Sequence, residues 1–170
     1  KPDSTVALAI AGKSNLEQGN ISASAAYYRK LAEIDTASVE VLSSLEDIYR
    51  AQSDQQNLIW ALERHNKLAP EDLKVLGELC EVYYAVGRLD EGLQYVKNGL
   101  VLNPKDGRFH ILMGENYRSL GQTSKALEEY KLALCDSQWK SSAQRLIWQI
   151  EKPESEQEKQ EREFFSRGKK

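Results

Sequence analysis

The chain has 170 residues, of which 41% are hydrophobic and 29% charged, with a formal net charge of −3. This composition is ordinary for a folded domain and argues against disorder throughout the chain. The mild acidity disfavours a nucleic-acid binder, which usually carries a basic patch. No run of about 18 apolar residues exists, which predicts that no membrane span is present.

The strongest pattern along the chain is a repeat with a step of 34 residues. Pro70 and Pro104 are one step apart. The same step relates three further sets: Gly19, Ser53, Gly87 and Gly121; Leu8, Leu42, Leu76 and His110; and Tyr49, Tyr83 and Tyr117. The alignment needs no gap. It predicts a lead over 1–4, four units over 5–38, 39–72, 73–106 and 107–140, a capping helix over 141–152, and a charged tail over 153–170.

Each unit is expected to fold as two helices joined by a turn. In the third unit, apolar residues from Leu76 to Tyr83 fall at i, i+3, i+4 and i+7, the stripe of an amphipathic helix. Gly87 marks the turn, as glycine does where a helix ends. A second helix then runs toward Pro104, which cannot continue it.

This period and these residues resemble the tetratricopeptide repeat (TPR), with its pattern W-x2-L-G-x2-Y, then A-x3-F, then P. The first two units keep Gly12, Gly19, Ser24 and Tyr28, and then Leu45, Tyr49 and Pro70. The last two keep Leu79, Tyr83, Gly87 and Pro104, and then Gly114, Tyr117, Gly121, Ala126, Tyr130 and Ala133. The resemblance implies an all-α fold, a right-handed α-solenoid of antiparallel helix pairs, and a role in binding other proteins.

One place in the period requires a small residue, because two helices approach closely there. Gly12, Cys80 and Gly114 share this place, so Cys80 is interpreted as a packing residue. Glu46 occupies the same place in the second unit. It leaves two alternatives open: either that helix pair is splayed, or the Glu46 side chain reaches the surface.

The segment after the repeats is predicted to cap the array. Its apolar residues again follow helical spacing: Ala143, Leu146, Ile147 and Ile150. Trp139 and Trp148 are expected to help cover the last face. The tail contains Phe164-Phe165 and is either a solvated helix or a mobile end, so the role of these two residues stays open.

Residues 7–14 formally match a loose phosphate-binding pattern that ends in Gly12-Lys13-Ser14. Such a loop needs a glycine-rich backbone between a strand and a helix, so that its N–H groups converge on phosphate. Here the segment coincides with the first predicted helix, and we expect no nucleotide binding.

No other motif indicates catalysis or a cofactor. Cys80 and Cys135 lack metal-binding spacing, and we expect both to be small buried thiols. His65 and His110 are expected to be partly buried core histidines, without a nucleophile beside them. We therefore expect no enzyme activity, no metal and no cofactor.

The TPR resemblance implies a groove lined by the first helix of each unit. Ten residues at groove-facing places are the candidate partner-binding residues: Lys13, Asp47, Arg50, Lys74, Glu78, Glu81, Tyr84, Arg108, Glu115 and Arg118. Asp47, Glu81 and Glu115 form an acidic column that suits a basic or amphipathic segment. Alternatively, Asp47 with Arg50 and Glu115 with Arg118 simply pair on a wet surface.

A known TPR subclass grips the terminal carboxylate of chaperone tails with a clamp of lysine and asparagine side chains. In this sequence only Lys74 matches the clamp, because other residues stand at the remaining places: Ala9, Lys13, Ser44 and Glu78. The departure predicts no tight binding of such acidic tails.

The sequence therefore predicts a protein–protein interaction scaffold that binds a peptide or helix in the groove. The alternatives are a self-associating structural array, and an accessory domain of a larger enzyme or assembly complex. Because the chain begins at Lys1 without methionine, we expect an excised region or a processed chain. Its cysteines fit the cytoplasm, and a periplasmic or membrane-tethered full-length protein stays open.

Overall fold

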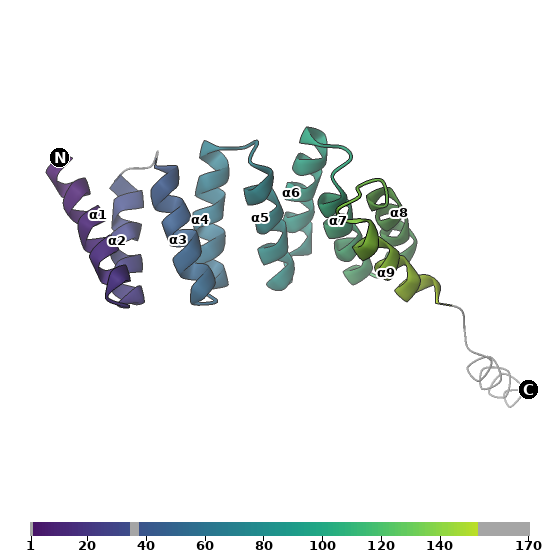
Figure 1. Ribbon diagram of the computed structural model, residues 1–170, viewed down its shortest axis with the longest axis horizontal. Helices are drawn as coiled ribbons and strands as arrows, with labels where there is room; N and C mark the ends of the chain where they lie inside the picture. Colours follow the sequence, from purple (N-terminus) through teal and green to yellow (C-terminus); the bar gives the residue numbers. More distant parts are fainter. Residues whose placement is uncertain (1, 35–37, 153–170) are drawn as a thin grey trace, which may run out of the picture.

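The computed structural model describes residues 2–34 and 38–152, and these residues form nine α-helices (Figure 1). The helices are α1 (Pro2–Glu17), α2 (Ile21–Ile34), α3 (Val39–Ala51), α4 (Gln55–Leu68), α5 (Leu73–Ala85), α6 (Leu89–Leu102), α7 (Gly107–Ser119), α8 (Thr123–Ala133) and α9 (Lys140–Glu151). The predicted all-α solenoid is confirmed. The predicted tail, with Phe164 and Phe165, lies outside the described residues.

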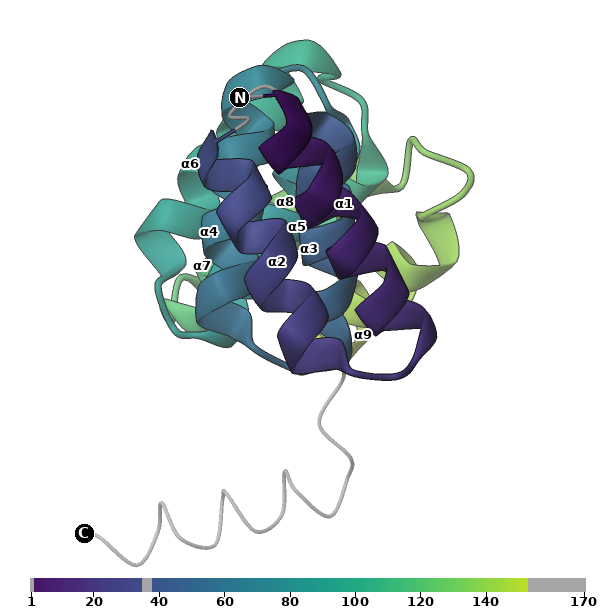
Figure 2. The same ribbon diagram turned by 90° about the vertical axis from the view of Figure 1, so that its left-hand side faces the viewer.

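The helices form a row of antiparallel hairpins, and each helix packs against the next one in the chain (Figure 1). From the N-terminal end, the hairpins stack behind one another (Figure 2). We call α1, α3, α5 and α7 the first helices, and α2, α4, α6 and α8 the second helices. Side-chain bonds join α3 to α5 and α5 to α7, whereas Arg29 on α2 donates to Asn57 on α4. First helices therefore neighbour one another on one side of the row, and second helices on the other.

Side-chain caps set where three first helices begin. Ser38, Asp72 and Asp106 each accept a hydrogen bond from a backbone N–H in the first turn of α3, α5 and α7. An N-cap oxygen satisfies a backbone donor that has no partner inside the helix. The three caps follow the step of the sequence repeat, so one local rule starts three successive helices.

The turn inside each hairpin contains one residue whose backbone has the left-handed conformation, with positive φ. Gly19, Gly87 and Gly121 have φ of 77°, 77° and 73°. Ser53 occupies the corresponding place between α3 and α4 with φ of 56°. A side chain is disfavoured in this region, which explains why three of the four positions are glycine.

Buried apolar side chains form three clusters along the described part of the chain. The largest extends from α1 to α6 and includes the fully buried Leu45, Leu62 and Leu79. A second lies around Val96 and Phe109, and the third, smaller one joins Tyr130 on α8 to Leu146 on α9. The core is therefore a chain of local clusters, as expected for stacked repeats.

The shared small-residue place is confirmed as a site of close packing. A Cβ atom on Gly12 would lie 3.1 Å from the Tyr28 ring, and one on Gly114 would lie 2.3 Å from the Tyr130 ring. Cys80 is fully buried, and the Asn116 amide donates to its Sγ at 3.5 Å. Burial raises the pKa of the Cys80 thiol to about 12, so this cysteine is an inert packing residue.

The alternative of a surface position for Glu46 was wrong, because its side chain is buried and its carboxylate lies 2.8 Å from Nδ1 of His65 on α4. A buried carboxylate requires such a partner, because burying a lone polar group is costly. The α3–α4 hairpin is the least closely packed of the four hairpins, in the direction of the splayed alternative. His65 and His110 are buried as predicted, and His110 lies 2.8 Å from the Glu129 carboxylate.

Two further expectations were wrong. Cys135 is exposed, because it lies in the connection between α8 and α9. Trp148 is 61% exposed, because α9 turns Leu146 and Ile147 toward α7 and α8 instead. The end of α9 therefore presents an indole ring to solvent.

Candidate functional site

The ten candidate residues all lie on first helices, and we call the surface they form the first-helix face. Lys13 lies on α1, Asp47 and Arg50 on α3, Lys74, Glu78, Glu81 and Tyr84 on α5, and Arg108, Glu115 and Arg118 on α7. Whether these residues bind a partner stays a prediction. The structure shows how each of them is held.

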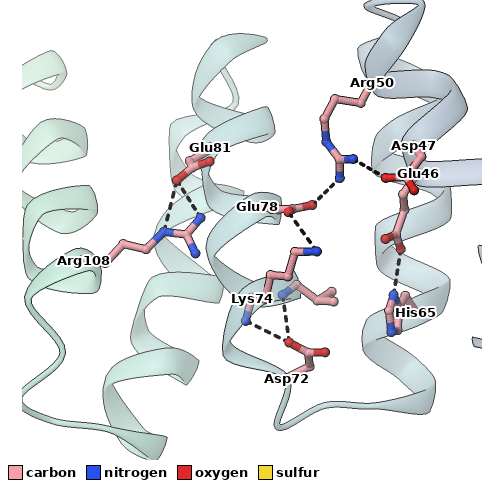
Figure 3. A network of polar contacts seen from close by, with 10 residues as sticks. Glu46, Asp47, Arg50, His65, Asp72, Lys74, Glu78, Glu81 and Arg108 are labelled. Atoms are coloured by element: carbon pink, nitrogen blue, oxygen red, sulfur yellow. Dashed lines mark hydrogen bonds and ion pairs between the residues drawn. The ribbon is translucent and has the colours of Figure 1, made fainter. Parts of the chain in front are cut away.

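An ion-pair network connects α3 with α5 (Figure 3). Arg50 contacts the Asp47 carboxylate at 2.6 Å on its own helix and the Glu78 carboxylate at 2.8 Å on α5. Lys74 lies 4.0 Å from the same Glu78. The predicted surface pairing of Asp47 with Arg50 is confirmed. Because these groups are solvated, each pair contributes only about 0.2–1 kcal/mol, and the network mainly fixes the side chains in place.

Arg108 bridges α7 and α5. Its Nη2 lies 2.7 Å from Oε1 of Glu81, and its Nε donates to the same oxygen at 3.3 Å (Figure 3). A Cβ atom on Gly77 would lie 2.6 Å from Cζ of Arg108, so the guanidinium rests on a bare stretch of α5 backbone. Since α5 and α7 also pack directly against each other, Arg108 closes the space between them.

The remaining members on α5 and α7 bond near the turn end of these two helices. Tyr84 and Ser119 share a hydroxyl–hydroxyl hydrogen bond of 2.9 Å. Arg118 contacts Glu115 at 2.7 Å, which confirms the second predicted surface pair. Glu115 also accepts from the Tyr130 hydroxyl at 2.9 Å, and burial followed by this contact raises the pKa of Tyr130 above its ordinary value.

A cleft lies between α1 and α3, and it consists of two neighbouring pockets that share Ser44. The first has a volume of about 260 Å³ and the second about 180 Å³. We call them together the α1–α3 cleft, and its lining is Ala9, Ile10, Lys13, Tyr28, Glu40, Val41 and Ser44 in the first pocket and Leu16, Ile21, Ser44, Asp47, Ile48 and Ala51 in the second. Of the ten candidate residues, the cleft brings together Lys13 and Asp47.

Half of the cleft lining stands at groove-facing places implied by the TPR resemblance, namely Ala9, Lys13, Leu16, Glu40, Asp47 and Ala51, whereas Ile10, Val41 and Ile48 were missed. The side chains of Ile10 and Leu16 on α1 are 64% and 40% exposed, and Val6, nearer the start of the same helix, is 59% exposed. A signal for this surface is present in the sequence, because residues 6–12 of α1 are apolar around most of the helix. A helix that is apolar on more than one face has a second surface to cover.

A further cavity lies on the opposite side, between α2 and α4, with a volume of about 490 Å³. Three of its four charged lining residues, Arg29, Glu33 and Asp54, have partners within the chain. Arg29 donates to Asn57, pairs with Glu33 at 3.6 Å and stacks 4.0 Å from the centre of the Trp60 ring. Asp54 caps α4. This cavity is therefore a wide, internally paired depression.

The segment with the phosphate-loop pattern lies within α1, where backbone N–H groups bond within the helix. Among residues 2–34 and 38–152, no group of three or more His, Cys, Asp and Glu side chains is arranged to hold a metal ion. No helix in the same ranges is both long and apolar enough to cross a membrane.

The stacked hairpins and the first-helix face define a protein with the tetratricopeptide-repeat fold, and the predicted resemblance is confirmed at this level. A crystal structure of MamA protein is similar, with a TM-score of 0.72 and 18% identity over 88% of this chain and 82% of that chain. The MamA RS-1 ArsTM double mutant has a TM-score of 0.69 and 16% identity over 96% of this chain and 92% of that chain.

A tetratricopeptide repeat protein from Parabacteroides merdae ATCC 43184 is also similar, with a TM-score of 0.67 and 15% identity over 87% of this chain and 60% of that chain. No family model matches the sequence, and no curated protein matches it. At these identities the likeness establishes the fold, and function has to be argued from the surface.

Proposed function

We propose that this chain is a protein–protein interaction scaffold that binds a peptide or helical segment of a partner on its first-helix face. One observation carries the proposal: ordered side chains of α3, α5 and α7 form a continuous bonded surface, and the α1–α3 cleft opens beside it. The two pockets are smaller than the ~300–1,000 Å³ of small-molecule sites. They suit side chains of a partner protein.

The charges of the face also bear on what the partner is. Glu78 stands where a carboxylate clamp needs a basic residue, and it is already engaged by Arg50 and Lys74. A terminal carboxylate placed there meets a like charge, which disfavours binding. The proposed partner is therefore not an acidic chaperone tail. It is a basic or amphipathic segment.

Affinity capture with the full chain, followed by isothermal titration with the recovered partner, tests this proposal. We expect charge reversal on the face, Glu81→Lys or Asp47→Lys, to weaken binding at least tenfold. Glu33→Lys is the matched control, because Glu33 and Glu81 are 55% and 48% exposed, each paired with one arginine, and Glu33 lies on α2. Equal losses in control and test variants, or no loss in either test variant, would overturn the proposal.

Exposed apolar side chains at both ends of the array favour a second candidate, a self-associating structural array. Val6 is exposed on α1 and Trp148 on α9, and contact between such ends generates open chains of subunits. Sedimentation over a wide concentration range distinguishes the candidates. A species that grows with concentration and is lost in Trp148→Ser supports self-association, and a monomer throughout removes it.

A further inference from the structure

We infer that the α1–α3 cleft anchors an amphipathic helix of a partner protein, with aliphatic side chains in its two pockets, a carboxylate at Lys13 and a cation at Glu40. The inference rests on the proposed function. It specifies which part of the first-helix face makes the anchoring contact and which chemistry it selects.

The first-helix face is open at α1–α3 and bridged elsewhere. Arg108 lies on Gly77 and binds Glu81, which fills the space between α5 and α7. Arg50 spans from α3 to Glu78 on α5. A third cavity of about 260 Å³ lies near the turn end of α3 and α5. Arg50 and Glu81 line it, and both are already engaged in ion pairs, so a side chain that enters there competes with these pairs. An incoming apolar side chain therefore enters most readily between α1 and α3.

The dimensions of the cleft match one face of a helix. Val41 lines the first pocket and Ile48 the second, and both are buried at its floor. Seven residues of α3 separate them, about 10 Å along the axis at 1.5 Å per residue. A bound helix running along α3 presents side chains at i and i+7 with the same spacing, and its i+3 or i+4 side chain lies over Ser44.

The walls of the cleft are predominantly apolar, which selects aliphatic side chains. Ala9 and Ile10 from α1 face Val41 across the first pocket, and Leu16 faces Ile48 and Ala51 across the second. Ile10 and Leu16 are exposed in the free chain. Covering such side chains with leucine or isoleucine of a partner contributes about 25 cal/mol per Å² of apolar surface buried.

Two charged side chains at the cleft indicate which charges the partner helix carries and in which direction it lies. Of the five lysines and arginines on the described first helices, four are within 4.0 Å of a carboxylate: Arg50, Lys74, Arg108 and Arg118. Lys13 and Glu40 line opposite walls of the first pocket, and neither has an ion-pair partner in the described part of the chain. A partner helix with an acid on the flank facing α1 and a base on the flank facing α3 complements both, which fixes its orientation.

The probe for this inference is a fluorescein-labelled helical peptide with leucines at i, i+3 and i+7, one glutamate on one flank and one lysine on the other. Fluorescence anisotropy with the full chain measures its binding. We expect Ser44→Arg, which places a long charged side chain where the two pockets meet, to weaken binding at least tenfold. Ser22→Arg is the matched control, since Ser22 lines the cavity on the α2–α4 side. The Ser44 hydroxyl bonds only a carbonyl of its own helix, so the substitution leaves the fold intact.

The charge assignment has its own test. The Lys13→Glu variant is expected to bind the peptide more weakly. A second peptide, with lysine in place of its glutamate, is expected to bind this variant as well as the first peptide binds the wild type. Equal binding by the wild type, Ser44→Arg and Lys13→Glu overturns the inference. Displacement of the peptide from the wild type by excess Ser44→Arg chain, whose own cleft is blocked, would show that the cleft takes a second copy, and also overturns the inference. If Glu81→Lys weakens capture of the natural partner while Ser44→Arg does not, the proposed function stands and the anchoring site is wrong.

Discussion

The carboxylate of Glu46 on α3 lies 2.8 Å from Nδ1 of His65 on α4, and both side chains are buried within one hairpin. In the other three units the place of Glu46 is held by Gly12, Cys80 and Gly114. A charged residue at a close-packing position is tolerated here because His65 supplies a hydrogen-bonding partner from the facing helix.

This pairing predicts non-additive effects on stability. Each single variant, Glu46→Ala or His65→Leu, leaves the other buried polar side chain without its partner. We expect each to lower the unfolding free energy by about 1–3 kcal/mol. The double variant replaces the pair by apolar groups, so its loss is expected to be smaller than the sum of the two. Urea unfolding of the four proteins measures the coupling, and strict additivity would show that the contact contributes nothing.

Glu46 also predicts how stability changes with pH. The pKa of Glu46 is raised above its ordinary value of 4.5, and burial is the largest cause. Contacts with His65 on α4 and the charge of Arg50 on α3 lower this pKa, whereas the charge of Glu78 on α5 raises it further. A raised folded-state pKa contributes stability that is complete below the unfolded-state value and is lost as pH rises through the folded-state value. From pH 4.5 upward, the wild type is therefore expected to lose more unfolding free energy than Glu46→Gln. Parallel urea midpoints for the two proteins between pH 5 and 7 would contradict this.

The hairpin turns predict a stabilising substitution. Ser53 has φ of 56°, a region that costs an L-residue about 1–2 kcal/mol and glycine little. Part of this gain is offset because glycine has more conformational freedom than serine in the unfolded chain. We therefore expect Ser53→Gly to raise the unfolding free energy by about 0.5–1 kcal/mol. Gly87→Ser is the reverse change with no neighbouring atom within 4 Å, and it is expected to lower stability by a similar amount. Thermal unfolding of both variants tests the sign.

Two helical glycines predict opposite tolerance to alanine. A Cβ on Gly114 would lie 2.3 Å from the Tyr130 ring, which is buried and cannot move aside. Overpacking of this kind costs about 1–3 kcal/mol. A Cβ on Gly77 would instead meet the Arg108 guanidinium, the far end of a flexible side chain, at 2.6 Å. We expect Gly77→Ala to be neutral or stabilising because alanine favours the helix. Similar destabilisation of both variants in urea would contradict this account.

The fold could be predicted from the sequence because each signal is local and recurs. Pro70 and Pro104 follow the ends of α4 and α6, and the left-handed turn falls at Gly19, Gly87 and Gly121. The fourth turn residue, Ser53, was found through the period alone. The repeat step thus located the turn at Ser53, which the residue type alone does not indicate.

The candidate site could be predicted only in part, because it depends on contacts between units. The ten residues were assigned to first helices correctly, and two of their surface pairs were expected. The contact of Arg50 with Glu78 and the position of Arg108 over Gly77 depend on how closely successive hairpins approach, and no single-helix pattern encodes that distance. The division of the α1–α3 cleft into two pockets, with Val41 and Ile48 in their lining, escaped notice for the same reason.

The division of the core into successive clusters determines how the array opens. Because each helix rests mainly on its sequence neighbours, separating one hairpin removes support from the adjacent hairpin and leaves distant ones packed. We therefore expect amide exchange to be graded along the row and fastest at α9, which relies on the small cluster around Tyr130 and Leu146. A ligand bound against α1 would slow exchange in α1 and the helices beside it and leave exchange in α9 unchanged, so the two ends of one molecule respond to binding independently.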